Sequence, residues 1–501
     1  MKIYNAAQIR AWDAYTIEHE PVGSVELMNR AARAFTDWLV QIYPDSQRPV
    51  CVFAGTGNNG GDGLAVARLL HRQFYEVQVV ICDFSGQHSA DFEAQRVVMP
   101  EGVAMTVLRE WNEPVAVAEN AIVVDALFGT GLSRPLDGES WPQLIDYLNT
   151  LPNEIVAIDL PSGLFADQAT DGPVVHATRT FSFERPKLAF FFPENALRVG
   201  EWAYGPIGLQ AEFDRQTATP WHYLTPADAA GLVQPRSKFS HKGSFGHALL
   251  LAGSRGKIGA AVLAARACLR AGVGLLTVHV PGCGYGVLQS RVPEAMCSTD
   301  AHPDMISQWP DLQKITTVGI GPGLGTHPTT AAAMQQLLEA VQHPVVIDAD
   351  ALNLLAQHPA WWPLVPRNSI LTPHPKEFER LFGPAANEFA RHELHRRVAQ
   401  QHGVIIVLKG AHTAVALPDG SCWFNSTGNP GMATGGTGDV LTGILTGLLA
   451  QGCAPEQAAR LGVYLHGLAG DLAAAERSQA ALVAGDLVEV MGRAWRMMGA
   501  E

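Results

Sequence analysis

A glycine-rich stretch near the end of the chain, residues 425–449, contains residue types that suit phosphate chemistry. It begins polar, turns apolar and contains six glycines: Gly428, Gly431, Gly435, Gly436, Gly438 and Gly443. This change of character predicts a loop that leads into an amphipathic helix. Glycines at such a junction let backbone N–H groups converge, and the helix N-terminus adds partial positive charge. The stretch therefore suits a bound phosphate.

One acid, Asp439, stands at this place. A phosphate repels a neighbouring carboxylate, so a task such as accepting a proton from an attacking hydroxyl would explain the acid. The N–H groups of residues 435–438 would then stabilise the transferring phosphoryl group. The alternative is an ordinary glycine-rich turn in which Asp439 caps the helix.

Three polar, glycine-rich loops in the first half also follow apolar segments, at residues 54–63, 125–134 and 159–163. In parallel sheets, ligands bind outside the carboxyl ends of the strands. We therefore expect four side chains of these loops to converge: Asn59, Asp125, Asp159 and Ser162. Their oxygens would suit a hard cation beside a phosphorylated ligand. Alternatively, the loops are tight turns and the acids are helix caps or surface charges.

In the second half, His374 is predicted to contact a ligand because it lies in a strand-end loop between two prolines that restrict its backbone. Lys409 follows a strand and could balance phosphate charge, although a lysine there is often only solvated. Asp350 and Asn353 fit ligand contact and helix capping equally well. Among the 18 histidines no H-x-x-x-H spacing with supporting acids indicates a metal site.

Alternating strands and helices must position these residues. In the first half we expect strands at 50–53, 77–82, 121–126 and 155–160, and helices at 6–18, 25–42, 64–72, 90–98 and 141–148, with Asn5 and Ser24 as N-caps. In the second half we expect strands at 247–251, 275–280, 317–320, 345–348, 370–371 and 404–408, a helix at 259–271, and an edge hairpin from 414–417 and 422–424. This alternation predicts parallel sheets covered by helices on both faces.

The bulk composition limits the classes of partner. A chain of 501 residues suits two large domains, and a proline-containing stretch of weak periodicity at 212–240 places their boundary close to residue 220. There, Thr225 is predicted to cap a helix that has Pro226 at its first position. The formal charge of -13 disfavours nucleic acid and anionic membranes as partners. Seven cysteines without a C-x-x-C pair, no signal peptide and no long apolar segment indicate the cytoplasm.

On these motifs the second half resembles the ribokinase-like superfamily and, within it, the nucleotide-dependent NAD(P)H-hydrate dehydratases. The motifs stand at 242–246, 321–325, 347–353 and 371–375 and in the loop with Asp439. The first half resembles the NAD(P)H-hydrate epimerases through residues 57–63, 125–135 and 159–163. The resemblance implies an α/β protein with two three-layer αβα domains, a Rossmann-like epimerase domain over 1–220 and a ribokinase-like dehydratase domain over 221–501.

The resemblance also implies a two-step repair of nicotinamide cofactors that are hydrated on the reduced ring. The first domain would interconvert the R and S epimers of the hydrate, NAD(P)HX. The second would phosphorylate the ring hydroxyl of the S epimer from ADP and eliminate phosphate, restoring NADH or NADPH. The implied partners are NAD(P)HX, ADP with Mg²⁺ and further copies of this chain, and a potassium ion would be held by Asn59, Asp125 and Ser162.

The resemblance assigns roles to individual residues. In the epimerase domain it makes Asp159 catalytic and places the hydrate against Asn58, Asn59, Gly60, Gly61, Asp62, Gly129, Thr130, Gly131, Leu132, Ser133, Arg134, Pro135 and Asp159. In the dehydratase domain the hydrate would meet Ala260, Gly323, His374 and the catalytic Asp439. The nucleotide would meet Lys409, Gly410, Ala411, His412, Thr413, Gly435, Gly436, Thr437 and Gly438. Ala32 and Lys376 depart from the family, which usually has glycine at both positions.

Two other functions remain open at this point. The second half could be an ATP-dependent kinase of a small alcohol that shares the Gly-Thr-Gly-Asp chemistry. The first half could be a binding module that captures nucleotides for it.

Overall fold

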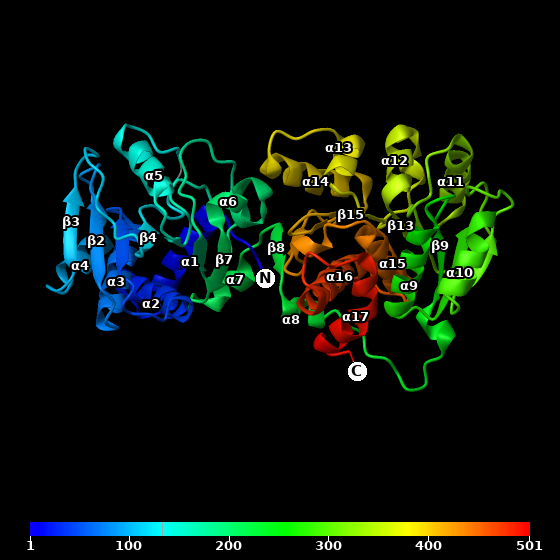
Figure 1. Ribbon diagram of the computed structural model, residues 1–501, viewed down its shortest axis with the longest axis horizontal. Helices are drawn as coiled ribbons and strands as arrows, with labels where there is room; N and C mark the ends of the chain where they lie inside the picture. Colours follow the sequence, from blue (N-terminus) through cyan, green and yellow to red (C-terminus); the bar gives the residue numbers. More distant parts are fainter. Residues whose placement is uncertain (133, 501) are drawn as a thin grey trace. The chain divides into compact units, whose positions relative to one another are not determined.

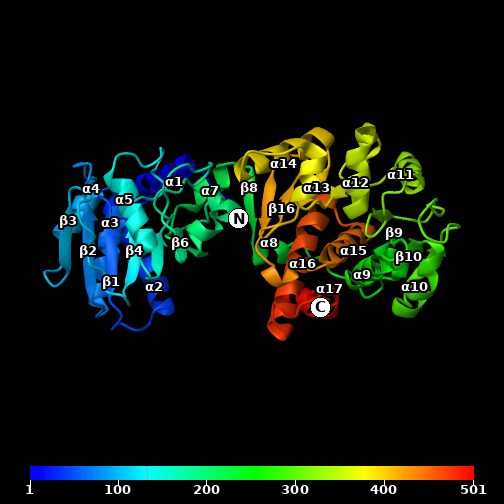
Figure 2. The ribbon, with the colours of Figure 1, turned by 45° about the horizontal axis from the view of Figure 1, so that its top comes forward.

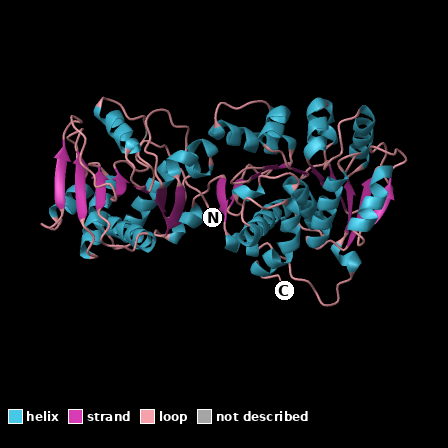
Figure 3. Ribbon diagram, viewed as in Figure 1, coloured by secondary structure: helices cyan, strands magenta, loops and turns pink. Residues whose placement is uncertain are grey.

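The computed structural model describes residues 1–132 and 134–500, which form two compact units. One unit comprises Lys2–Thr219 with Asn387–Phe389, and is called the N-terminal unit below. The other, the C-terminal unit, comprises Met1, Pro220–Ala386 and the chain from Ala390 onward. Each unit contains its own sheet, and Figure 3 shows the strands of each between helices.

The N-terminal unit is built on a seven-stranded sheet of order β3-β2-β1-β4-β5-β6-β7, in which every neighbouring pair is parallel. Its strands are β1 Val50–Ala54, β2 Val77–Cys82, β3 Ala104–Leu108, β4 Ile122–Ala126, β5 Ile155–Ile158, β6 Arg179–Phe183 and β7 Glu201–Gly205. The strand order reverses between β1 and β4. At such a switch point the loops after the two strands diverge and leave a crevice for a ligand.

Helices cover both faces of this sheet because alternate residues of each central strand point to opposite sides. On one face Val52 and Ala54 pack with residues of α2, α3 and α4, and on the other Cys51 and Phe53 pack with residues of α5. The helices, seen in Figure 1, are α1 Ala6–His19, α2 Ser24–Ile42, α3 Asn58–Arg72, α4 Ala90–Val97, α5 Ser140–Thr150, α6 Ala196–Val199 and α7 Ala211–Gln216. Two short 3-10 turns, Leu188–Phe191 and Pro193–Asn195, follow β6.

The C-terminal unit contains a ten-stranded sheet of order β11-β10-β9-β12-β13-β14-β15-β16-β17-β8, in which only the β15–β16 and β16–β17 pairs are antiparallel. Its strands are β8 Trp221–Leu224, β9 His247–Leu251, β10 Leu275–Val280, β11 Met296–Thr299, β12 Thr317–Ile320, β13 Val345–Ile347, β14 Ile370–Leu371, β15 Ile405–Leu408, β16 Ala414–Ala416 and β17 Cys422–Asn425. The central strands are buried along their whole length, as a sheet with two covered faces requires.

Two layers of helices cover this sheet, as the two views in Figures 1 and 2 agree. On one face Ile347 and Ile406 pack with α11 Pro328–Ala340, α12 Ala349–Gln357, α13 Pro375–Phe382 and α14 Glu388–His402. On the other, Val346 and Val407 pack with α15 Thr437–Ala450, α16 Pro455–Arg477 and α17 Ala484–Met497. The remaining helices are α8 Pro226–Ala230, α9 Ile258–Arg270 and α10 Tyr285–Arg291, with 3-10 turns at Lys242–Phe245, Gly282–Gly284, Pro359–Leu364 and Pro430–Met432.

The α/β fold class with parallel sheets is confirmed, and several local predictions are corrected. Asn5 and Thr225 cap their helices as expected, but Gly23 is the N-cap of α2, so the prediction for Ser24 was wrong. The segment 58–63, predicted as loop, forms the first turns of α3 because its glycines allow close packing: a Cβ on Gly63 would lie 2.5 Å from the Cβ of Ala126. The predicted hairpin is formed by β16 and β17 but is not at the edge, since β8 pairs with β17.

Within the described part of the chain, no helix has both the length and the apolar character needed to cross a bilayer.

Helices α9 and α15 approach closely through a glycine. A Cβ on Gly443 would lie 2.1 Å from the carbonyl oxygen of Ala264. We predict that Gly443→Ala lowers the free energy of unfolding of the C-terminal unit by about 1–3 kcal/mol, because the two helices must separate. In the control Gly492→Ala the new methyl meets no atom within 4 Å, so higher helix propensity should stabilise by about 0.5–1 kcal/mol. Urea unfolding followed by circular dichroism measures both, and equal effects would contradict the packing account.

Candidate active sites

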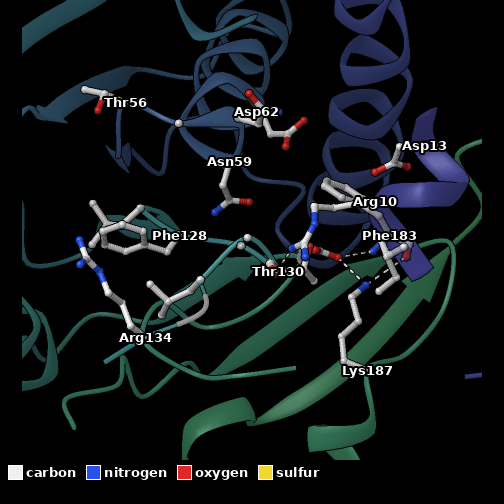
Figure 4. A pocket seen from close by; sticks show the side chains of 18 of the residues that line it. Arg10, Asp13, Thr56, Asn59, Asp62, Phe128, Thr130, Arg134, Phe183 and Lys187 are labelled. Carbon is white, nitrogen blue, oxygen red and sulfur yellow. Dashed lines mark hydrogen bonds and ion pairs between the residues drawn. The ribbon is translucent and has the colours of Figure 1, made fainter. Parts of the chain in front are cut away.

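The N-terminal unit contains a cavity of about 570 Å³ at the carboxyl ends of its strands. Its walls come mainly from α1, from the start of α3 and from the loops that follow β1, β4, β5 and β6, with smaller contributions from residues after β2 and β7. Figure 4 shows Asp13, Asn59, Asp62 and Lys187 around this space. The cavity therefore lies at the carboxyl edge of the sheet. The polar residues of the strand-end loops were expected to converge at this edge.

Asp159 is held in this cavity by a buried ion pair. Its Oδ1 lies 2.7 Å from Nζ of Lys187, a side chain that is only 1% exposed, and accepts a hydrogen bond from the N–H of Phe183 at 3.0 Å. The backbone of Asp159 has φ 64°, in the left-handed region that a non-glycine residue rarely adopts. A strained backbone and a buried cation together orient this carboxylate, because neither partner can turn away without losing the other.

Two further carboxyls line the same cavity, and the pKa of each is raised. Burial, followed by the negative charge of Asp159, raises the pKa of Asp13 to about 7. The same two causes, with Asp13 and Asp91 adding to them, raise the pKa of Asp62 well above its usual value. Lys187, which pairs with Asp159, lowers the pKa of Asp13 only in part against these two causes. A group with a pKa near neutrality can both give and take a proton at physiological pH.

Asp125, near the end of β4, and Ser162, which follows β5, are hydrogen-bonded to each other and are not among the residues that line the cavity. The Ser162 hydroxyl donates to Oδ1 of Asp125 at 2.5 Å, and the Ser162 N–H donates to Oδ2 at 2.7 Å. Burial raises the pKa of Asp125 to about 6 against these hydrogen bonds, which lower it. Asn59 lies beside the Gly129 backbone, where a Cβ on the glycine would come within 3.0 Å of its Oδ1.

Most predicted hydrate-binding residues of this unit line the cavity. They are Asn58, Asn59, Asp62, Gly129, Thr130, Gly131, Leu132, Arg134, Pro135 and Asp159, while Ser133 lies outside the described residues. Gly60 and Gly61 are not among the lining residues. They pack inward instead, since a Cβ on Gly60 would lie 1.8 Å from the oxygen of Gly55 and one on Gly61 would lie 2.8 Å from Cε of Met28.

Sequence reasoning assigned no role to Arg10, Asp13 or Lys187, all of which line the cavity. Arg10 and Asp13 lie on α1, where polar residues are as common on a solvated helix face as in a site. Lys187 follows β6, and a lysine after a strand gives no local sign that it is buried. The only signal available was its position shortly after a strand.

In the C-terminal unit, α15 begins at Thr437 with Gly436 as its N-cap, in the left-handed region at φ 95°. Asp439 is therefore in the first turn of the helix and does not cap it, so the capping alternative is wrong. Burial and then the charge of Asp348 raise the pKa of Asp439 to about 7, although Lys409 opposes this shift. The acid thus lies at a helix N-terminus with a pKa suited to proton transfer at neutral pH.

Lys409 and Asp348 form the ion pair of this site. Nζ of Lys409 lies 3.0 Å from Oδ1 of Asp348 and 3.7 Å from Oε2 of Glu377. Burial would lower the pKa of Lys409, but these two carboxylates outweigh it and raise the pKa. The Asp348 carboxylate, 1% exposed, also accepts hydrogen bonds of 2.7 Å from the hydroxyls of Thr372 and Thr442. A Cβ on Gly438 would lie 3.5 Å from Lys409 Nζ, so the glycine loop and the ion pair adjoin.

The other predicted contacts of the hydrate surround the same strand ends. His374 caps α13, with Nδ1 accepting from the N–H of Lys376 at 3.1 Å, and burial lowers the pKa of its imidazole. Asp350 accepts from the N–H of Gly325 at 2.8 Å and thereby holds the loop that contains Gly323. A Cβ on Gly323 would lie 3.2 Å from the Cβ of Ala260, so those two positions adjoin. Asn353 accepts from Arg380 on the neighbouring helix.

The segment 409–413, predicted to meet the nucleotide, forms a turn between β15 and β16. The Thr413 hydroxyl donates to the carbonyl of Gly410 at 3.2 Å, which closes the turn. Gly410 and Ala411 are exposed at its tip, whereas burial lowers the pKa of the His412 imidazole. The start of α15 is accessible to solvent, because Gly435 is exposed and the next three residues, Gly436, Thr437 and Gly438, are half-buried.

Each half of the chain matches a known protein family. Residues 248–493 match the family model described as NAD(P)H-hydrate dehydratase, and residues 24–189 match the model described as YjeF-related protein N-terminus. A bifunctional NAD(P)H-hydrate repair enzyme from Moorella thermoacetica is 36% identical over 98% of this chain and 96% of its own length. The enzyme of the same name from Escherichia coli is 36% identical over 93% of this chain and 89% of its own.

A solved structure supports the same placement. The ADP/ATP-dependent NAD(P)H-hydrate dehydratase from Bacillus subtilis, co-crystallised with ATP and Mg²⁺, has a TM-score of 0.50 and 35% sequence identity to this chain. The match covers 56% of this chain and 100% of the Bacillus chain. With two matched halves in the order of the full-length relatives, the chain belongs to the family of bifunctional NAD(P)H-hydrate repair enzymes.

Proposed function

We propose that this protein restores hydrated nicotinamide cofactors in two steps. The domain over 1–220 epimerises R- and S-NAD(P)HX, and the domain over 221–501 dehydrates the S epimer at the expense of ADP, with NAD(P)H, AMP and phosphate as products. The observation that carries this proposal is the near full-length similarity to repair enzymes of this activity. The two sites described above support it, because each pairs a binding surface with an acid whose pKa lies near 7.

In the epimerase domain the start of α3 and the loop after β4, both of which line the cavity, bind the hydrate, and Asp159 is the catalytic carboxylate. Epimerisation must break and remake a bond at the hydroxyl-bearing carbon of the ring, so protons have to be delivered and removed. The Lys187 ion pair fixes the position of Asp159. Asp13, with a pKa of about 7, exchanges protons in the same cavity.

The residues Asn59, Asp125 and Ser162 fit a potassium ion. All hydrogen-bond partners described for the fully buried Asp125 carboxylate are neutral N–H and O–H groups, so within the described residues no cationic side chain pairs with it. When bound, the ion would supply that missing positive charge. Asp125, Ser162 and the amide oxygen of Asn59 would hold it and so fix the two loops beside the hydrate.

In the dehydratase domain Asp439 accepts the proton of the ring hydroxyl as the hydroxyl attacks the nucleotide. The N–H groups at the start of α15 stabilise the transferring phosphoryl group, and Lys409 balances its charge. The Bacillus relative was co-crystallised with ATP and Mg²⁺, a hard cation that oxygen donors such as the Asp350 carboxylate would suit. When bound, Mg²⁺ would neutralise the phosphates. Phosphate then leaves the ring carbon with the electrons of its C–O bond, and loss of a proton from the neighbouring carbon restores the double bond.

The alternative, an ATP-dependent kinase of a small alcohol, has less support. Both the family match over residues 248–493 and the Bacillus structure are described as hydrate dehydratases.

Seven free cysteines support a reducing compartment, and with it the predicted cytoplasmic location. Assembly into a homo-oligomer stays a prediction.

The reaction itself tests the proposal. Incubation with S-NADHX, ADP and Mg²⁺ should restore the absorbance of NADH and release one phosphate per NADH. Starting from the R epimer, consumption should exceed the spontaneous rate of epimerisation. A stable phosphorylated hydrate with no NADH would identify a kinase instead, and R-epimer consumption at only the spontaneous rate would leave the first half as a binding module.

For the dehydratase site, we predict that Asp439→Asn lowers kcat for dehydration by about 10²- to 10⁴-fold and leaves epimerisation intact. The base works as its carboxylate, and its pKa is raised to about 7, so activity of the wild type should fall as pH decreases through about 7. The variant should lack this limb of the pH profile of kcat. The same limb in Asp439→Asn would show that another group titrates.

For the epimerase site, we predict that Asp159→Asn lowers the epimerisation rate by about 10²- to 10⁴-fold, since the amide keeps the shape but loses the charge that pairs with Lys187. Dehydration of purified S epimer serves as the internal control and should be unchanged. An equal loss of both activities would argue against two independent sites.

A further inference from the structure

A cluster of three buried side chains in the C-terminal unit belongs to neither candidate active site. His392 and His395 lie one turn apart on α14, and Cys422 is the first residue of β17. One nitrogen of each imidazole and the sulfur all lie within 4.8 Å of one another. The exposed fractions of the three residues are 5%, 0% and 0%. The figures label α14 on the face of the sheet that also carries α11 to α13.

The hydrogen bonding of His395 leaves one nitrogen available as a ligand. Its Nε2 lies 2.8 Å from the carbonyl oxygen of Ile406, and because a carbonyl only accepts, Nε2 must carry the hydrogen. In the neutral imidazole Nδ1 then has a bare lone pair. This Nδ1 is buried and has no hydrogen-bond partner among the described residues. A histidine that binds a metal through one nitrogen commonly donates its other N–H to a backbone carbonyl, which is the arrangement of His395.

The residues around Cys422 distinguish it from an ordinary buried cysteine. Cys268, in the same unit, is equally buried, and burial raises the pKa of both thiols, but only Cys422 has two imidazoles beside it. The ring of Phe378 lies 5.7 Å from that of His395, and the ring of Phe424 lies 5.2 Å from that of His392. An apolar shell of this kind excludes water from the three ligand atoms.

We propose that His392, His395 and Cys422 form a three-coordinate site for a soft monovalent ion, Cu⁺. Thiolate and imidazole are ligands that copper favours. On binding, Cu⁺ replaces the thiol proton, which is released to solvent, so the copper–thiolate unit is neutral and avoids the cost of a buried charge. Zn²⁺ would leave a net positive charge and would need a fourth ligand, because its protein sites are almost always tetrahedral.

The geometry requires a modest contraction. Ligand atoms at about 2.0–2.3 Å from a metal lie roughly 3.5–4 Å apart in a trigonal site, compared with the 4.8 Å limit found here. We expect rotation of the Cys422 side chain and of the His392 ring to supply this movement. The site holds the helix to the strand, so Cu⁺ should also raise the melting temperature of the protein.

The test titrates reduced full-length protein with Cu⁺ under anaerobic conditions in competition with a chromogenic Cu⁺ chelator. Wild-type protein should retain one equivalent that both Cys422→Ser and His395→Gln lose. The matched control Cys268→Ser should retain it. Circular dichroism and dehydratase activity report whether each variant is folded, since none of the three substitutions touches the proposed catalytic residues.

X-ray absorption spectroscopy of the Cu⁺-loaded wild-type protein identifies the ligand atoms without the use of variants. One sulfur and two nitrogen neighbours support the site, whereas a shell of sulfur alone overturns it and points to other cysteines. Retention of the equivalent by folded Cys422→Ser overturns it as well. Binding of Zn²⁺ as tightly as Cu⁺ would refute the charge argument on which the choice of metal rests.

Discussion

An ion pair between a buried aspartate and a lysine determines the electrostatics at the ligand-binding edge of each sheet. In the N-terminal unit Asp159 lies 2.7 Å from Lys187, and in the C-terminal unit Asp348 lies 3.0 Å from Lys409. Each pair sits where a strand ends, and its lysine neutralises one carboxylate in a place that water reaches poorly. A second acid nearby, Asp13 or Asp439, then feels burial together with the residual negative charge, and its pKa rises to about 7.

In both sites, therefore, burial and a neighbouring carboxylate raise the pKa of an acid to about 7, although the two folds differ. Both reactions proposed here move a proton at the hydrated ring, and a group with a pKa near 7 does so most effectively near neutral pH. The lysine has a different part in each. Lys187 is fully buried and orients Asp159, whereas Lys409 is partly exposed and adjoins Gly438, where a phosphate would bring further negative charge.

The glycines of both sites act through packing as much as through loop flexibility. Gly60 and Gly63 bring α3 against the backbone of the β1–α3 turn and against β4, and Gly443 and Gly447 bring α15 against α9. A Cβ at Gly60, Gly443 or Gly447 would collide with main-chain atoms and one at Gly63 with side-chain atoms, so the glycines allow each helix to pack this closely. The N-termini of α3 and α15 thereby face the ligand sites, and Asn59 and Asp439 project from their first turns.

The sequence by itself predicted the alternation of strands and helices around the centre of each sheet, because alternating apolar segments have a period that local composition encodes. It missed the strands β3, β6, β7, β8 and β11, which lie at or next to the sheet edges. It also identified the polar segments that follow the strands, with Asn59, Asp159, Lys409 and Asp439 in them, although Asn59 and Asp439 belong to the first turns of helices. Only the tertiary structure joined Asp159 to Lys187, placed Asp13 in the cavity and brought Cys422 to His395. These contacts link residues that are distant along the chain. They depend on strand order, register and helix orientation, which a local pattern does not specify.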